Sequence, residues 1–198
     1  MKLKKWTIYV MRLMSSYVGD IVMPVGGWRY RIGVRLGGYH LARQYPRYLA
    51  SHNAKRGIES FARQFVCGTA LDLGSGGSPL AGCRPIDNGT DENAYHINEQ
   101  DKSVDFVFSS HCFEHLNAPC DALKEIGRVL SDTGKVLVYL PHPACELWSQ
   151  NVNEHHLSFF WPDEWRNLFE KNGFSILEMS YQPDGMMSFY ILASRQEN

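Results

Sequence analysis

A short apolar run that ends in glycines constrains the fold of this chain more than any other feature. Residues 69–73 (Thr-Ala-Leu-Asp-Leu) have the length and character of a buried strand, and Gly-Ser-Gly-Gly-Ser-Pro follows. Gly74 and Gly76 permit a tight turn and let a ligand approach the backbone closely. Asp72, just before the turn, can accept hydrogen bonds from a cationic ligand group. The run predicts a ligand site at the carboxyl end of a strand in an open α/β sheet.

Apolar runs and helical patterns alternate after this turn. Further strands are predicted at Val104–Phe108, Lys135–Leu140, Phe174–Met179 and Ser188–Ala193. Helices are predicted over Ala122–Leu130, with Asp132–Gly134 as the stop, and from Pro162 to just before Gly173. Strands that alternate with helices indicate a parallel sheet with crossover helices.

A second carboxylate follows where the next strand would end. Asp87 closes the sequence Arg-Pro-Ile-Asp, and a carboxylate there can accept hydrogen bonds from both hydroxyl groups of a ribose. In a dinucleotide-binding unit this acid stands about 20 residues beyond the glycines. Asp87 follows Gly76 too closely for that, and Pro79 stands where the third glycine would be. Both facts argue against a nicotinamide cofactor.

The net charge of −1 conceals a separation of charge along the chain. Residues 1–66 carry twelve Lys and Arg but only Asp20 and Glu59, a formal charge of +10, and residues 67–198 carry −11. We therefore expect a basic, largely helical N-terminal extension over 1–66 that packs on or caps a domain over 67–198. The basic part suits an anionic acceptor, a partner or peripheral contact with a membrane, while the neutral total argues against a uniformly basic nucleic-acid binder.

The cysteines and the first residues indicate the compartment. Five cysteines without a C-x-x-C pair fit neither a disulfide framework nor a four-cysteine zinc site, and they favour reduced thiols in the cytoplasm. Arg12 and Asp20 interrupt the N-terminal apolar stretch, which argues against a signal peptide and a spanning helix. A helix lying on an anionic membrane and a helix packed on the domain both stay open.

Four ordered motifs together resemble the class I S-adenosylmethionine-dependent methyltransferases, and among them the small bacterial type 11 group, with a shortened segment after the first strand. The motifs are Leu71–Gly76, Asp101–Leu116, Ala122–Leu130, and His156–Trp165 followed by Gly173-Phe174. The resemblance implies S-adenosylmethionine as the cofactor. It also implies a Rossmann-like α/β fold, with a mostly parallel central sheet and an antiparallel last strand.

The resemblance assigns roles to individual residues. The glycine turn would lie against the amino-acid part of the cofactor, with Asp72 near its ammonium group and Asp87 on its ribose. Residues 93–94 would lie beside the adenine, and residues 109–111 near the reacting methyl group. The implied cofactor-binding residues are Asp72, Leu73, Gly74, Ser75, Gly76, Asp87, Asn88, Asn93, Ala94, Ser109, Ser110 and His111. No metal ligand is implied.

Two histidines, His111 and His156, are the candidates for catalysis. A hydroxyl acceptor loses its proton as it attacks, and an imidazole with a near-neutral pKa can take it. The chain lacks the N-P-P-Y type of motif that is associated with amino-group methylation of nucleic-acid bases. We therefore expect methyl transfer to a small-molecule, glycan- or lipid-type acceptor and no specific binding of nucleic acid.

Two other functions compete with methyl transfer. A catalytically silent Rossmann-like module could bind a partner or a membrane through the basic N-terminal region. In addition, residues 111–115 spell H-x-x-E-H, a zinc-peptidase signature in which His111 and His115 would bind zinc and Glu114 would activate water. A peptidase needs these residues inside a long helix, whereas here they directly follow a predicted strand.

Overall fold

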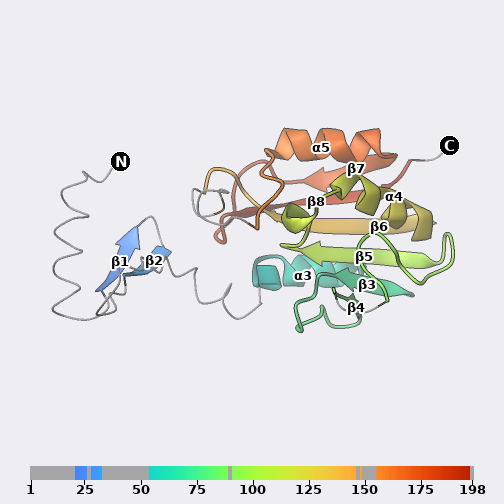
Figure 1. The fold of residues 1–198 in the computed structure, drawn as a ribbon, viewed down its shortest axis with the longest axis horizontal. Coiled ribbons are helices and arrows are strands. Elements are labelled where there is room, and N and C mark those ends of the chain that lie inside the picture. The colour runs from blue at the N-terminus through green and yellow to red at the C-terminus, as the bar shows by residue number, and fades with distance from the viewer. Residues whose placement is uncertain are drawn as a thin grey trace. The chain divides into compact units, whose positions relative to one another are not determined.

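The computed structural model describes residues 21–25, 28–32, 54–88, 91–145, 148 and 155–196. The chain divides into two compact units, Met1–Ser51 and His52–Asn198 (Figure 1). In the part of the chain that is described, no helix has the length and apolar character needed to cross a membrane.

The described part of the first unit is a pair of antiparallel strands, β1 (Ile21–Val25) and β2 (Trp28–Ile32). These residues differ from the predicted helical extension. Both runs are rich in β-branched and aromatic residues, and Gly26-Gly27 between them is a typical hairpin signal, so the strand preference prevails. The rest of the predicted extension, up to residue 53, lies outside the described residues.

The second unit contains a six-stranded sheet in the order β4-β3-β5-β6-β8-β7. The strands are β3 (Ala70–Leu73), β4 (Arg84–Ile86), β5 (Val104–Ser110), β6 (Leu130–Pro141), β7 (Phe174–Met179) and β8 (Ser188–Arg195). The pairs β3–β4, β3–β5 and β5–β6 are parallel, and β8 runs antiparallel to both β6 and β7. The predicted mostly parallel sheet with an antiparallel last strand is confirmed.

Helices cover both faces of this sheet (Figure 1). They are η1 (Ala54–Gly57), α3 (Glu59–Ala62), η2 (Arg63–Phe65), η3 (Phe113–His115), α4 (Pro119–Val129) and α5 (Pro162–Lys171). The apolar residues of α4 and α5 share one buried cluster with Leu71, Val107 and Val138. Ile58 and Ala62 belong to a second buried cluster, which also contains Ala70, Phe106 and Tyr139. Alternate residues of each strand therefore face opposite layers, as the pleat requires.

The junction between α4 and β6 differs from the prediction. The helix ends at Val129, and Leu130 is already extended (φ −68°, ψ 129°), so Asp132–Gly134 continue β6 instead of acting as a stop. A register shift lies at this point, between the pairs that Val104 and Phe106 make with β6. A Cβ atom on Gly134 would lie 2.8 Å from the carbonyl oxygen of Val104, so glycine lets the strands approach there.

The boundary between the two units also lies earlier than the charge pattern suggests. It falls at Ser51–His52, whereas the change in charge predicts residue 66. Residues 54–65 form three short helical turns, and Ile58 and Ala62 within them are buried against the sheet. Part of the basic segment is therefore core structure of the second unit.

Candidate functional site

The turn after β3 requires glycine at its first position. Gly74 has a φ of +73°, which L side chains rarely adopt. A Cβ atom there would also lie 2.6 Å from both Cβ and Sγ of Cys112. The Gly74 amide donates to the carbonyl oxygen of Ile86 at 2.8 Å, which ties the turn to the end of β4. The loop after β5 thus packs directly on the glycine turn.

Asp87 directly follows β4 and contacts the glycine turn. Its Oδ2 accepts a hydrogen bond from the Ser75 hydroxyl at 2.5 Å, and its Oδ1 accepts one from the Gly76 amide at 3.0 Å. Each carboxylate oxygen carries two lone pairs, so both can accept a second hydrogen bond from a ligand hydroxyl. Asn88 follows as an exposed residue. The structure therefore joins the predicted turn and the predicted ribose acid.

Asp72 is buried beneath the turn. Its Oδ2 accepts a hydrogen bond from the Leu80 amide at 2.7 Å, which closes the loop that the glycines open. Burial raises the pKa of Asp72 to about 6, against the opposing effects of the Leu80 amide and the Lys55 ammonium group. Lys55 itself donates to the carbonyl oxygen of Ser78 in the same loop. A buried carboxylate of this kind gains from a further cationic group nearby.

The end of β5 supplies the next residues of the site. Ser109 is buried, and its hydroxyl donates to the carbonyl oxygen of Leu73 at 3.0 Å. Leu73 itself packs in the core, so only its backbone can reach a ligand. The Ser110 hydroxyl is buried and has no hydrogen-bond partner among the residues that the structure describes. Such an orphaned donor is what a ligand group would satisfy.

His111 turns the chain sharply after β5. Its φ is +52°, and its amide donates to the carbonyl oxygen of Tyr139 at 2.9 Å. One ring nitrogen, Nε2, lies 2.9 Å from the Ser188 hydroxyl. The other, Nδ1, lies 3.4 Å from Oε1 of Glu114. A left-handed backbone is uncommon at a non-glycine residue, and functional sites are among the places where it is found.

His156 lies in the same cluster but deeper. It is 2% exposed, and Nδ1 donates to the carbonyl oxygen of Trp148 at 2.7 Å. Burial lowers the pKa of His156, although the nearby carboxylate of Glu114 opposes the shift. The Trp148 ring lies 5.3 Å from the His111 ring and 5.9 Å from the His156 ring, between ring centroids. The structure therefore brings the two candidate histidines to one cluster.

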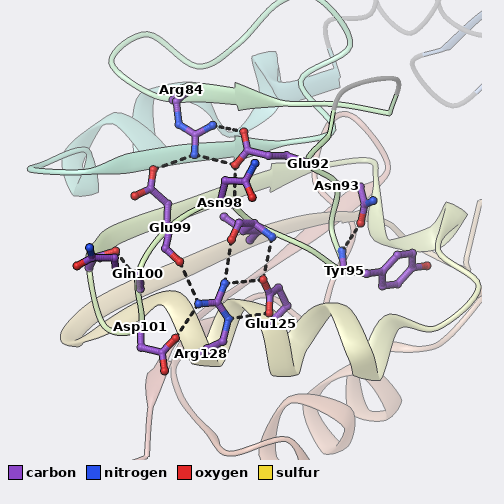
Figure 2. A network of polar contacts seen from close by, with 12 residues as sticks. Arg84, Glu92, Asn93, Tyr95, Asn98, Glu99, Gln100, Asp101, Glu125 and Arg128 are labelled. Carbon is purple, nitrogen blue, oxygen red and sulfur yellow. Dashed lines mark hydrogen bonds and ion pairs between the residues drawn. The ribbon is translucent and has the colours of Figure 1, made fainter.

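Asn93 and Ala94 lie in a segment held by charged side chains (Figure 2). Arg84 donates to Glu92 and Glu99, the latter at 2.8 Å. Asn93 forms an isolated β-bridge with His96, and its side chain accepts from the Tyr95 amide at 2.8 Å. Ala94 is 9% exposed.

Arg128 on α4 holds this segment from the other side (Figure 2). It donates to the carbonyl oxygens of Ile97 at 2.8 Å and Glu99 at 2.9 Å. It also forms ion pairs of 2.7 Å with Asp101 and Glu125. The expected adenine side is thus shaped by two arginines.

Comparison with known proteins decides the family. A family model described as a methyltransferase domain matches residues 42–179, more than half of the chain. The chain belongs to this methyltransferase family. The match confirms the methyltransferase resemblance and S-adenosylmethionine as its cofactor. A search of curated proteins finds no match for this methyltransferase.

Solved structures share the fold of this methyltransferase at low identity. One belongs to a complex of the Haloferax volcanii Trm112 methyltransferase activator with a methyltransferase (15% identity, TM-score 0.58, 76% of this chain and 97% of that one). A second is a methyltransferase from Thermotoga maritima (16% identity, TM-score 0.55, 76% of this chain and 94% of that one). A third is a methyltransferase from Aquifex aeolicus (16% identity, TM-score 0.56, 74% of this chain and 96% of that one).

The residues of this methyltransferase fit the cofactor's chemical groups. Asp87 offers acceptors to ribose hydroxyls, and the buried Asp72 carboxylate favours a cationic group nearby. A Cβ atom on Gly77 would meet nothing within 4 Å, so the turn is open on that side. The orphaned Ser110 hydroxyl adds a donor.

The zinc-peptidase interpretation of residues 111–115 is wrong. His111 follows β5 in a left-handed conformation, and the helical turn η3 contains only Phe113–His115. His111 and His115 therefore do not lie one turn apart on a long helix, as that mechanism requires.

Two residues that shape the site of this methyltransferase were not predicted, and a third was predicted in another role. Lys55 and Leu80 hold the loop and Asp72, while Glu114, expected only as part of a zinc site, lies among three histidines. The first two carry no recognisable signal in the sequence. Glu114 stands in the H-x-x-E-H pattern, but the pattern does not show that His156 packs beside it.

Proposed function

We propose that this chain transfers the methyl group of S-adenosylmethionine to a small-molecule, glycan- or lipid-type acceptor, with His111 contacting the acceptor. The observation that carries the proposal is the packing of Cys112 on Gly74, because it puts the turn that contains His111 against the expected cofactor turn. Bound S-adenosylmethionine supplies an electrophilic methyl group.

The protein's part in the reaction is positioning and proton transfer. Asp87, Ser75 and the glycine turn would hold the cofactor. An acceptor hydroxyl would replace Ser188 as the partner of His111 Nε2, since the Ser188 hydroxyl also lies 3.2 Å from the carbonyl oxygen of Met186 and can turn to it. Nε2 would then take the acceptor's proton while the carboxylate of Glu114, 3.4 Å from Nδ1, stabilises the charged ring.

His111 suits this role better than His156. His156 is almost fully buried, and the Trp148 carbonyl fixes one of its nitrogens. The basic residues of the first unit support binding of this unit to an anionic group or surface.

Calorimetric titration with S-adenosylmethionine tests the proposal first. We expect saturable binding, and no heat at millimolar cofactor would contradict it. With a panel of phenols, glycans and lipids as acceptors, release of S-adenosylhomocysteine then reports turnover. His111→Gln should lower turnover about 100-fold or more, whereas Glu170→Gln, at an exposed position on α5, should leave turnover unchanged.

A further inference from the structure

Three side chains of types that bind transition metals converge beside η3. Glu114 and His115 come from η3, and His156 comes from the segment before α5. One ligand atom from each lies within 4.8 Å of the others. Glu114 and His156 are buried, while the side chain of His115 is 40% exposed.

Backbone carbonyls fix the tautomers of both imidazoles. Nδ1 of His115 lies 2.8 Å from the carbonyl oxygen of His155, and Nδ1 of His156 lies 2.7 Å from that of Trp148. A carbonyl oxygen can only accept, so each Nδ1 carries the proton and donates it. In the neutral rings each Nε2 therefore bears a lone pair. Proteins orient histidines that bind metal ions through Nε2 in this way.

Glu114 adds a buried carboxylate that faces imidazole rings. Both of its oxygens are buried, and neither accepts a hydrogen bond of ordinary geometry from the residues that the structure describes. The nearest imidazole nitrogens are Nδ1 of His111 at 3.4 Å and Nε2 of His115 at 3.8 Å from Oε1. Neutral imidazoles leave the charge of a buried carboxylate unbalanced, which is costly. A cation among the three residues would balance that charge and accept the two Nε2 lone pairs.

We propose that Glu114, His115 and His156 bind a divalent transition-metal ion of the Zn²⁺ class. Two imidazole nitrogens and one carboxylate oxygen are a known zinc ligand set, and they leave a fourth position for water or another ligand. Ligand atoms about 2.1 Å from such an ion lie about 3.4 Å from one another, so small side-chain rotations complete the site. The half-exposed His115 gives the ion a route from solvent. The site goes beyond methyl transfer but shares Glu114 with the proposed reaction, because that carboxylate lies 3.4 Å from Nδ1 of His111.

Cobalt(II) is a suitable probe because its visible absorption is strong when only four or five nitrogen and oxygen atoms coordinate the ion and weak when six do. The full chain, freed of metal by chelator, is titrated with CoCl₂ at neutral pH. We expect one equivalent to produce the bands and ZnCl₂ to remove them. His115→Ala and Glu114→Gln should each weaken cobalt binding about tenfold or more. His96→Ala, which removes an exposed histidine outside the cluster, should not.

His115→Ala is the decisive variant because its half-exposed ring can be removed without opening the core. Circular dichroism and thermal unfolding check that it folds, and Zn²⁺ should raise the Tm of the wild type and of His96→Ala but not of His115→Ala. Bands that survive in folded His115→Ala, or the absence of stoichiometric cobalt binding by the wild type, would overturn the proposal. Titration of the same samples with S-adenosylmethionine tests the cofactor site separately.

Discussion

The hydroxyl of Ser75 donates a hydrogen bond of 2.5 Å to Oδ2 of Asp87. This contact joins the turn after β3 to the residue that follows β4. The two parts that would hold the cofactor are therefore tied directly to each other. A direct tie of this kind reduces the ordering cost of binding.

Replacing Asp87 by alanine should weaken S-adenosylmethionine binding sharply. The variant loses charge-assisted hydrogen bonds worth about 1.5–3 kcal/mol each, so we expect Kd to rise about 10- to 100-fold. Isothermal titration measures the change. Asp91→Ala removes a nearby exposed carboxylate and should leave Kd unchanged. An equal effect of both substitutions would mean that Asp87 does not contact the ribose.

Gly74→Ala should destabilise the second unit by more than about 2 kcal/mol, because it combines the cost of a left-handed alanine, about 1–2 kcal/mol, with a collision. The added methyl group would meet Cys112 at 2.6 Å. Gly77→Ala is the matched control, since Gly77 has a φ of +79° but nothing within 4 Å. Urea unfolding compares the two. Equal losses would show that Cys112 moves aside without cost.

Arg128→Met should loosen residues 92–101 while α4 stays folded. The substitution removes hydrogen bonds to two backbone carbonyls, Ile97 and Glu99, and the ion pair that orients Glu125 toward the Ile97 amide. Hydrogen exchange should accelerate at the amides of Ile97 and Asn98, and cofactor affinity should fall. Lys124→Met, also on α4 but in an exposed pair with Asp121, should change neither. Unchanged hydrogen exchange at these amides in Arg128→Met would mean that Arg128 does not hold residues 92–101 in place.

Stability should depend on pH through Asp72. Its folded pKa of about 6 lies above the ordinary value of 3.8, so the folded protein binds this proton more tightly than the unfolded chain. The resulting stabilisation is full below about pH 4 and is lost as pH rises to about 6, a change of about 3 kcal/mol. Asp72→Asn should therefore gain stability relative to the wild type over this interval, as measured by urea unfolding. Parallel pH curves would contradict the shifted pKa.

The strands and helices of the second unit were largely predictable, because periodic apolar residues and proline or glycine at the ends act locally. Pro162 begins α5 and Gly173 follows it, as expected. The position of Asp87 at the end of the next strand also predicted that it lies beside the glycine turn. The hairpin at Ile21–Ile32 was predictable from its residue types, but the largely helical interpretation of residues 1–66 did not separate it from its surroundings.

Contacts between distant segments were not predictable. Lys55 reaches Ser78, and His156 packs beside Glu114, through the arrangement of the whole sheet and not through spacing. Although burial alone would raise the pKa of Glu114, the imidazoles of His111, His115 and His156 lower it overall. The spacing of these residues in a single sequence does not predict that three imidazoles surround this carboxylate.

The packing of residues 54–65 on the sheet limits where the chain can be shortened. A fragment cut at Cys67, where the charge changes sign, would lose Ile58 and Ala62 and expose the apolar residues beneath them, including Phe106. It would also lose Lys55, which ties down the loop beside Asp72. Such a fragment should aggregate, whereas one that begins at His52 keeps these contacts.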